Sequence, residues 1–505
     1  MAAMAPLFAW PVLLFTLPAL TWLLDGDVNR ANGNGWARLR AAFATGWWFG
    51  FGYFFGGLFW IGEAFLVEAE MFGWALPFAV TLMPAGLGVF YGLAATAATL
   101  AWRPGLTRLV ALALAIAIAE WLRGHVLSGF PWNTLGYALT APLMLAQSAS
   151  VLGIHGLTLI VMLVLPAPLI LLEDARAGRI GQSWRFAGIL AALVMLTAMT
   201  SFGMLRLAAG LAPMLEGVRL RLVQPSIAQR EKWRPEHQER IFFEHLALSG
   251  ASPAGLAGIT AVIWPEAAMP FRPLDSPEAL DHVGRLLPIG VHLIAGGLRM
   301  DEEPATQSRR VYNSLLVFGV GGAPVAIYDK LHLVPFGEYL PLQPLLEAIG
   351  LRQLTKLRGG FARGAAPRAL LRIPGLPTIG PLICYEAIFP GSLIQTPERP
   401  GLLVNVTNDG WFGETTGPHQ HLHQTRVRAI EEGIPIARVA NNGISAMIDP
   451  YGRILQRLEL NVKGVIDTGV PRAITPPLYA RTGDFVFLGM LAGLTVVLVV
   501  LLRRT

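Results

Sequence analysis

Three residues with reactive side chains follow apolar, strand-like runs in the second half of the sequence. Glu266 follows AVIWP, Lys330 follows VAIYD, and Cys384 follows GPLI. Folds of the α/β type commonly place reactive groups at strand ends. A cysteine thiolate is a nucleophile, a partly buried glutamate can accept the thiol proton, and a lysine can stabilise an oxyanion. Together these residues indicate acyl transfer from an amide or ester through a thioester.

Each of the three residues also has an ordinary structural interpretation. Free cysteine is among the most buried residue types, so Cys384 could be a small core residue. Glu266 and Lys330 could be partners in surface ion pairs. Cys384 is the only cysteine among 505 residues, which excludes an intrachain disulfide and a multi-cysteine metal site.

The composition indicates a membrane protein with a large polar domain. Hydrophobic residues make up 53% of the chain and charged residues 14%, whereas soluble domains usually carry about 25% charged residues. The net charge is only +6, and no basic run carries interleaved aromatic residues, so we expect no nucleic-acid partner. Apolar runs near the length of about 20 residues that crosses a bilayer lie at 6–24, 41–62, 75–102, 106–122, 141–172, 186–208 and 485–502.

These runs predict three units along the chain. Residues 1–210 form an N-terminal bundle of about six spans, residues 215–475 form a mixed domain, and residues 485–505 form a last membrane helix. In the mixed domain, strand-like runs such as "VRLRLVQPSI" and "GLLVNVTNDGWFG" alternate with helical segments such as 234–250. This alternation predicts a layered α/β domain.

Arginines orient the predicted spans, because basic residues are enriched in cytoplasmic loops. The basic loops follow the first, third and fifth spans and contain Arg30, Arg38 and Arg40, then Arg103 and Arg108, then Arg176, Arg179 and Arg185. We therefore expect these loops in the cytoplasm, the 215–475 domain outside it, and the C-terminus inside. Seven spans would also place the N-terminus outside.

Four sequence blocks resemble the motifs of the carbon-nitrogen hydrolase, or nitrilase, superfamily. They are "WPEAAMP", "YDKLHLVPFGEYLP", "LICYEAIF" and "VTNDGWFG". The resemblance implies a four-layer αββα sandwich, and it assigns a catalytic triad to Glu266, Lys330 and Cys384. It also implies that the Tyr385 backbone N–H assists Lys330 at the oxyanion.

The arrangement around that domain resembles the apolipoprotein N-acyltransferase family of Gram-negative bacteria. Further blocks agree, namely "EWLRGHVLSGFPWNTLGY", "LVQPSIAQREKW", "NNGISAMIDPYG" and "LYARTGD". Members of this family have eight spans, and this sequence begins at what resembles their second helix. The expected fold is therefore a polytopic α-helical membrane bundle plus an α/β nitrilase-like sandwich.

The resemblance implies a ping-pong reaction at the Gram-negative inner membrane, with the catalytic domain in the periplasm. Cys384 would take an acyl chain from a glycerophospholipid, with phosphatidylethanolamine as the expected donor. The thioester would then pass the chain to the α-amine of a diacylglyceryl-cysteine at a lipoprotein N-terminus. We expect no cofactor, no metal and a monomeric chain.

The resemblance also implies supporting residues around the triad. Glu338 would orient Lys330 or the base, and Tyr385 and Glu386 would shape the site beside the nucleophile. Asn313 matches a family position without an evident role. An ordinary surface or structural carboxylate remains the alternative for Glu386.

Three aromatic residues match positions that could contact lipid or substrate. Trp233 ends the "REKW" segment, and Trp411 and Phe412 lie between glycines in "NDGWFG". Paired aromatics on a flexible loop suit acyl chains at a membrane interface. Plain packing is the alternative for all three.

Two other polar groups have structural interpretations. The run "HQHLH" contains His419, His421 and His423, but only the first and last share a helix face, and no nearby carboxylate or cysteine completes a metal site. The intramembrane Glu120 is expected to pair with Arg123.

Two other functions remain open on the sequence. A membrane-anchored amidase or nitrilase would use the same triad with water as acceptor, although one anchor would then suffice. A transporter with a degenerate enzyme-like domain is disfavoured by the complete triad and by the lack of paired broken helices with intramembrane charges.

Overall fold

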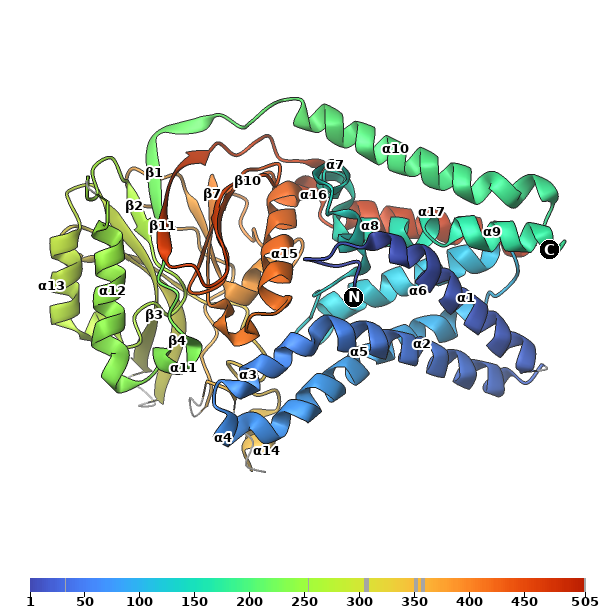
Figure 1. Cartoon of the computed structure of the whole chain (residues 1–505), viewed down its shortest axis with the longest axis horizontal. Coiled ribbons are helices and arrows are strands. Elements are labelled where there is room, and N and C mark those ends of the chain that lie inside the picture. The colour runs from blue at the N-terminus through green and yellow to red at the C-terminus, as the bar shows by residue number, and fades with distance from the viewer. Residues whose placement is uncertain (32, 253, 304–307, 349–352, 356–358, 504–505) are drawn as a thin grey trace.

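The computed structural model describes the chain except residues 32, 253, 304–307, 349–352, 356–358 and 504–505. It has two parts side by side, an α/β sandwich and a helix bundle (Figure 1). The bundle contains the N-terminal helices and the C-terminal helix α17, so the sandwich is inserted between the last two bundle helices in sequence.

The bundle consists of long apolar helices joined by short helical turns. Its long helices are α1 (Leu13–Arg30), α2 (Gly35–Leu58), α5 (Leu76–Thr99), α6 (Leu106–His125), α8 (Ala149–Val164), α9 (Ala167–Arg176), α10 (Ala187–Leu207) and α17 (Phe485–Arg503). The short ones are α3 (Glu63–Leu66), α4 (Ala69–Phe72) and α7 (Leu143–Ala146). Within the described residues, 6 helical stretches are long and apolar enough to cross a membrane. Large apolar side chains such as Leu190, Leu193 and Val496 are exposed on α10 and α17, as expected for surfaces that face lipid.

Two of the predicted spans differ from the observed helices. The run 6–24 is helical only from residue 10 onward, because Pro11 occupies the first turn and lacks the N–H that an earlier turn would need. The run 141–172 starts with the separate short helix α7, and the long apolar stretch spans Ala149–Arg176. Helix α6 coincides with the predicted fourth span in position, but it is not one of the six stretches above, and most of its residues are buried inside the bundle.

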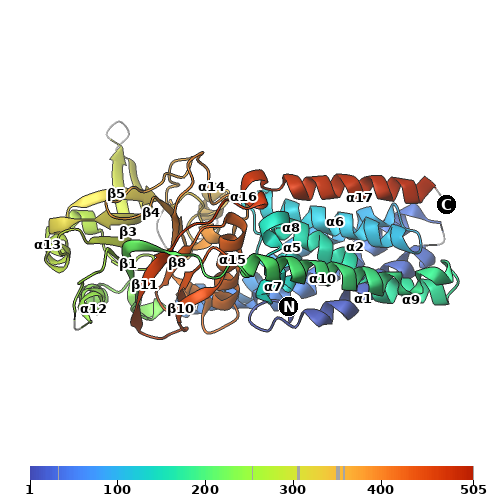
Figure 2. The same ribbon diagram turned by 90° about the horizontal axis from the view of Figure 1, so that it is seen from above.

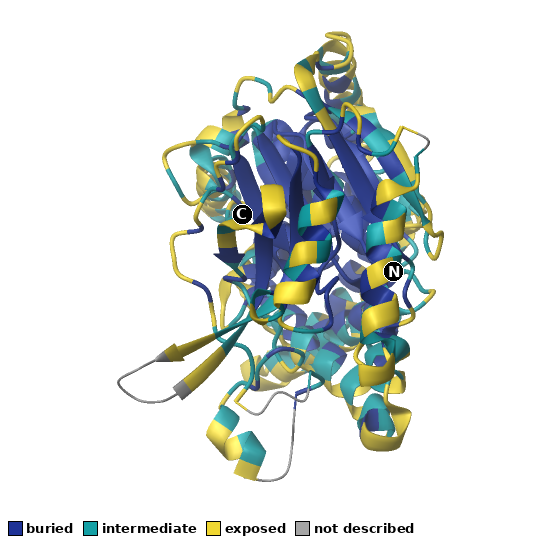
Figure 3. Cartoon of the chain, turned by 90° about the vertical axis from the view of Figure 1, so that its left-hand side faces the viewer, coloured by how far each residue is buried: buried dark blue, intermediate teal, exposed yellow. Residues whose placement is uncertain are grey.

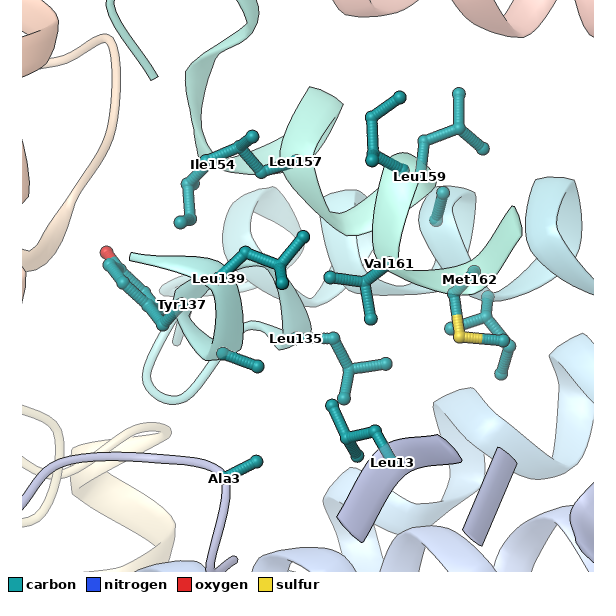
Figure 4. Close-up of a cluster of buried hydrophobic side chains, with 14 of the residues drawn as sticks. Ala3, Leu13, Leu135, Tyr137, Leu139, Ile154, Leu157, Leu159, Val161 and Met162 are labelled. Atoms are coloured by element: carbon teal, nitrogen blue, oxygen red, sulfur yellow. The ribbon is translucent and has the colours of Figure 1, made fainter. Parts of the chain in front are cut away.

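The centre of the bundle is packed with aliphatic side chains. Leu157 and Val161 of α8 are buried with Leu135 and Leu139 of the short helix η4 (Leu135–Leu139), and Leu13 of α1 completes the cluster (Figure 4). Burial of such side chains stabilises by roughly 1.5–3 kcal/mol each in water. Between helices in a membrane, close packing supplies the equivalent stabilisation.

The sandwich contains two sheets packed face to face. The first has six strands in the order β11-β1-β2-β3-β4-β5, and the second has five in the order β10-β9-β8-β7-β6. The strands of the first sheet are β1 (Met214–Gln224), β2 (Ala261–Ile263), β3 (His292–Glu303), β4 (Ser308–Phe318), β5 (Pro324–Asp329) and β11 (Gly464–Pro471). Those of the second are β6 (Ile379–Ile383), β7 (Leu402–Thr407), β8 (Ile436–Ala440), β9 (Ser445–Ile448) and β10 (Ile454–Leu458).

Helices cover the outer faces of both sheets and complete four layers. Helices α12 (Gln238–Gly250) and α13 (Pro277–Leu286) cover the six-stranded sheet, and α15 (Gly417–Glu432) covers the five-stranded sheet (Figures 1 and 2). The central strands are buried on both faces, which explains their continuous apolar sequences (Figure 3). This architecture confirms the expected membrane bundle plus αββα sandwich.

Helix α15 is the element shared by the two parts. Leu422 and Ala429 pack on the five-stranded sheet, whereas Val427 and Ile430 join the apolar core of the bundle. The remaining short helices are α11 (Gln229–Lys232), α14 (Gln343–Ala348) and α16 (Leu478–Thr482). Because α15 is buried on both sides, the sandwich and the bundle form one continuous packed body.

Candidate active site

The cysteine lies where a buried strand turns sharply. Strand β6 is buried throughout, and its parallel pairing with β7 aligns Ile383 with Val406. Cys384 opens the short helix η9 (Cys384–Ile388) with a φ of +50°, in the left-handed region that residues other than glycine seldom adopt. Such strained turns are often found at functional sites.

The glutamate lies beyond the end of β2, against a glycine of the neighbouring strand. A side chain at Gly296 of β3 would place its Cβ 2.6 Å from the Cα of Glu266, so only glycine allows this approach. The Ala268 N–H donates to the Gly296 carbonyl at 2.9 Å. Ala267 itself has a φ of +47°. The base candidate therefore also precedes a left-handed turn.

Lys330 is buried between two carboxylates directly after β5. Its Nζ donates to Glu338 Oε1 at 2.9 Å and to Glu266 Oε1 at 3.4 Å. Asn313 Nδ2 donates to the same two oxygens, at 2.9 Å and 2.8 Å. The Val334 N–H donates to the other oxygen of Glu338 at 2.8 Å. The structure thus brings together four of the predicted site residues in one hydrogen-bonded cluster.

Burial and the charges of this cluster together set the protonation of Lys330 and Cys384. Burial disfavours the charged form of Lys330, but Glu338 and Glu266 outweigh it and raise the lysine pKa, so Lys330 stays protonated. Burial is also the main cause that raises the pKa of the Cys384 thiol, Glu266 adds to it, and Lys330 opposes it. The resting cysteine is therefore a neutral thiol, and attack requires a base that removes its proton.

Glu386 is a buried structural carboxylate. Its Oε1 accepts hydrogen bonds from the Tyr328 hydroxyl at 2.7 Å and from the Leu331 and His332 N–H groups at 3.0 and 3.1 Å. Its Oε2 accepts from the Ile383 N–H at 2.7 Å. An Arg368 nitrogen lies 3.3 Å from Oε1. Glu386 therefore ties the turn of Cys384 to the segment that follows Lys330.

Tyr385 connects the nucleophile's turn to the membrane bundle. Its hydroxyl donates to the Gly129 carbonyl at 3.0 Å, and its ring stacks against Phe130 with a centroid separation of 6.4 Å. His332 Nε2 donates to the Ser128 carbonyl at 2.8 Å. The loop between α6 and η4 thus contacts both sides of the site.

A buried ion pair of the bundle anchors this loop. Glu120 Oε2 pairs with Arg123 at 2.5 Å, which confirms the predicted pairing, and Tyr91 donates to Glu120 Oε1 at 2.6 Å. The Arg123 guanidinium also donates to the carbonyls of Phe130 and Trp132. A charge pair inside the bundle therefore orients the loop that contacts Tyr385.

The three predicted lipid-contacting aromatics lie in different environments. Trp233 follows α11 and is 39% exposed. Trp411 is partly buried in the helical turn η10 (Asp409–Phe412). The ring of Phe412 packs against Trp60 and Trp132 of the bundle, with centroid separations of 4.4 and 5.8 Å. Their contact with lipid or substrate stays a prediction.

Lys232 and His421 are among the residues that contact the site but were not identified from the sequence. Lys232 of α11 donates from Nζ to the Glu266 carbonyl at 2.8 Å. His421 of α15 lies with Nε2 3.2 Å from the Cys384 carbonyl oxygen. Lys232 is part of the quoted "REKW" block and His421 of the "HQHLH" run, so each was visible in the sequence only as part of a motif. Among the described residues, no group of three or more His, Cys, Asp or Glu side chains is arranged to hold a metal ion.

These features define a class of protein, a nitrilase-type αββα domain carrying a Glu–Lys–Cys cluster, packed on a membrane helix bundle. Comparison with known proteins agrees for both parts. Residues 1–166 match the apolipoprotein N-acyltransferase N-terminal domain, and residues 219–475 match the carbon-nitrogen hydrolase family.

Curated relatives align with nearly the whole chain. The apolipoprotein N-acyltransferase of Rhodopseudomonas palustris is 46% identical, with 99% of this chain and 93% of the relative aligned. That of Bradyrhizobium diazoefficiens is also 46% identical, over 99% and 92% of the two chains, and that of Brucella melitensis 42% identical, over 91% and 86%. The chain belongs to the apolipoprotein N-acyltransferase family.

Solved structures that resemble the chain cover about half of it. An amidase from Nesterenkonia sp. is 19% identical, aligns with 56% of this chain and 98% of its own, and has a TM-score of 0.36. A carbon-nitrogen hydrolase from Helicobacter pylori is 13% identical over 50% and 89% of the two chains, with a TM-score of 0.38.

Proposed function

We propose that the protein transfers an acyl chain from a glycerophospholipid to the α-amine of the N-terminal diacylglyceryl-cysteine of apolipoproteins. One observation supports this most strongly: the turn that carries Cys384 belongs to both parts of the molecule. Cys384 is in the apolar core between the sheets, while Tyr385, Ile388 and Phe389 are in the apolar core of the bundle. A nucleophile in this position is next to the membrane part rather than on the far side of the sandwich.

In the first half-reaction, Cys384 attacks the carbonyl carbon of the phospholipid ester. Its thiol proton passes to Glu266, and the carbonyl oxygen becomes an oxyanion near the Lys330 ammonium and the Tyr385 N–H. The ester C–O bond then breaks, and Glu266 returns the proton to the departing lysophospholipid oxygen. The acyl chain is left as a thioester on Cys384.

In the second half-reaction, the α-amine of the diacylglyceryl-cysteine attacks the thioester carbon. Glu266 accepts a proton from the amine as the C–N bond forms, and the C–S bond breaks. The proton then returns to the Cys384 sulfur, which restores the neutral thiol that burial favours. A thioester is activated toward amines, so the ester of the donor supplies the driving force and no nucleotide is required.

The same proposal places the enzyme in the inner membrane, with the sandwich in the periplasm. The start of α6 and the end of α9 lie away from the sandwich (Figure 1). In the sequence, Arg103 comes just before α6, and Arg176 is the last residue of α9. Basic loops mark the cytoplasmic face, which leaves the sandwich on the opposite face. The expected donor is phosphatidylethanolamine, and we expect the chain to act as a monomer.

Mass spectrometry of the intact protein after incubation with phosphatidylethanolamine tests the proposal. Because the chain has one cysteine, we expect a single acyl adduct that hydroxylamine removes and that peptide mapping places on Cys384. The adduct should be absent in Cys384→Ala and should disappear when a diacylglyceryl lipopeptide is added. An acyl group on another residue, or discharge by water as fast as by the lipopeptide, would sink the transferase proposal.

A further inference from the structure

The two residues proposed to exchange the proton both adjoin left-handed turns. Cys384 itself has a φ of +50°, and Ala267, directly after Glu266, has a φ of +47°. Such a turn fixes where the side chain points, but it persists only if surrounding groups hold it. The peptide carbonyls of Cys384 and Glu266 are the groups by which the turns could be held.

A buried lysine holds the carbonyl of Glu266. Lys232 is 2% exposed, and its Nζ donates to this oxygen at 2.8 Å. Burial lowers its pKa to about 8, although Glu266 and Cys384 act in the opposite direction. The lysine is therefore close enough to both reacting groups for its charge to affect them. Lys232 contacts the main-chain carbonyl of Glu266, whereas Lys330 contacts the side-chain carboxylate of the same residue.

A buried histidine holds the carbonyl of Cys384. His421 Nε2 lies 3.2 Å from this oxygen, which can only accept, so the contact requires a proton on Nε2. His421 Nδ1 lies 2.9 Å from Asp409 Oδ1, and Asp409 Oδ2 accepts from Arg438 at 2.7 Å. All three side chains are buried, so this network fixes the imidazole rigidly beneath the turn.

The fixed network is charged, and it is connected to the Cys384 thiol through Thr407, whose hydroxyl donates to Asp409 Oδ1 at 3.0 Å and hydrogen-bonds with the thiol. Burial disfavours the ionised form of Asp409, yet Arg438 and His421 outweigh it and hold its pKa well below the ordinary value. Asp409 and Arg438 therefore remain an ion pair, and the imidazole is held against the ion pair on one side and the Cys384 carbonyl on the other. This rigid arrangement suits a support of the Cys384 turn.

We propose that Lys232 and His421 are positioning residues, which hold the main-chain carbonyls of Glu266 and Cys384 and thereby align the base with the nucleophile. The inference rests on the proposed function, because alignment matters only if Glu266 activates Cys384. Substitution of either residue should therefore slow attack by the thiol more than it destabilises the fold. Misplacement of a reacting group by about 1 Å can cost 10²-fold in rate.

Alkylation of the single cysteine measures that alignment without any acyl substrate. We compare the rate at which iodoacetamide modifies Cys384 in the full-length, detergent-solubilised protein, read as a mass shift, with the rate of acylation by phosphatidylethanolamine. Lys232→Met and His421→Leu remove these two donors but keep similar side-chain volume, and the longer 3.5 Å side-chain contact from Asn405 Nδ2 then remains at the Cys384 carbonyl. We expect both rates to fall by about 10²-fold while the melting temperature changes no more than in the controls.

Matched controls lie on the same helices. Arg230→Met removes an exposed cation from α11, and His423→Leu removes a buried imidazole from α15 that contacts Thr140 instead of Cys384. Neither control should slow alkylation. His421→Gln keeps an N–H donor near the Nε2 position and should restore most of the rate lost in His421→Leu.

Three results would overturn the proposal. They are alkylation at the wild-type rate in both donor variants, equal loss in the His423→Leu control, and no recovery in His421→Gln. The same experiment distinguishes failure of this proposal from failure of the proposed function. If the proposed function fails, phospholipid does not acylate the wild-type protein, but the alkylation rates of the donor variants still differ from those of the controls.

Discussion

The candidate site lies between two walls, one formed by residues that follow strands of the six-stranded sheet and one by residues that follow strands of the five-stranded sheet. The two walls hold their charged groups in different ways. In the wall from the six-stranded sheet, Lys330 contacts both Glu266 and Glu338 at the site itself. In the wall from the five-stranded sheet, the cysteine is neutral, and the ion pair of Asp409 and Arg438 lies beneath the turn that carries it.

This difference suggests separate roles, because the first wall holds the charged groups proposed to react and the second wall holds the thiol in place. The proposed reaction needs a base and an oxyanion-stabilising cation, and the residues proposed for these roles, Glu266 and Lys330, both belong to the first wall. The second wall needs a fixed thiol, and it fixes the thiol with buried polar contacts to the backbone. Substitutions in the first wall should therefore change rate more than stability, whereas loss of the buried Glu386–Arg368 pair in the second wall should change both.

The largest effect is expected for the base. Glu266→Gln keeps the side-chain shape but cannot accept the thiol proton, so acylation of Cys384 should slow by about 10²–10⁴-fold, the usual contribution of a general base. Single-turnover acylation with phosphatidylethanolamine measures it. A loss below tenfold would mean that another group accepts the proton. Unfolding should occur within a few degrees of the wild type.

A second-wall substitution should lower stability as well. In Glu386→Gln, the amide NH₂ would face groups that donate hydrogen bonds to the Glu386 carboxylate in the wild type. The substitution would also leave Arg368 without its carboxylate partner. Breaking a buried pair in this way costs about 3–5 kcal/mol, so the melting temperature and the acylation rate should fall together. Chemical or thermal unfolding monitored beside activity checks this, and a slow but fully stable variant would contradict it.

The sequence predicted the proposed triad but not the buried contacts that support it. Glu266, Lys330 and Cys384 were recognisable because each follows an apolar strand and lies in a known motif. Lys232 and His421 were not, because their contacts are with main-chain carbonyls distant in sequence. Helical spacing places His419 and His423 on one face of α15. It does not predict which element packs against the face that carries His421. The αββα layers followed from the motifs, whereas the contact of Tyr385 with the 128–130 loop depends on how the sandwich packs on the bundle.

Because its pKa is lowered, Lys232 should make the stability of the protein depend on pH. Burial lowers its pKa from the ordinary value of 10.5 to about 8 in the folded protein. Between these values the unfolded chain binds more protons at this residue, so its contribution to stability rises with pH from about 8 to 10.5 and is flat below. The melting temperature of wild type minus that of Lys232→Met should increase over this range. A constant difference would contradict the assignment, and Arg230→Met serves as the control.

The smallest effect is expected at the contact with the bundle. Tyr385→Phe keeps the ring beside Phe130 but removes the hydrogen bond to the Gly129 carbonyl. One neutral hydrogen bond contributes about 1 kcal/mol, so we expect a modest loss of stability and a fall in acylation of less than tenfold. If activity were abolished in a folded protein, the Tyr385 hydroxyl would have to take part in the chemistry.

The most direct test of acyl transfer is the discharge of a pre-acylated enzyme by two matched acceptors. Protein carrying a labelled acyl chain on Cys384 is separated from donor and mixed with a diacylglyceryl lipopeptide, or with the same lipopeptide acetylated on its α-amine. The account predicts rapid loss of the thioester with the label recovered as an amide on the free-amine lipopeptide, and slow loss with the acetylated one. Equal rates for the two acceptors, with the label released as free fatty acid, would contradict it and indicate a hydrolase.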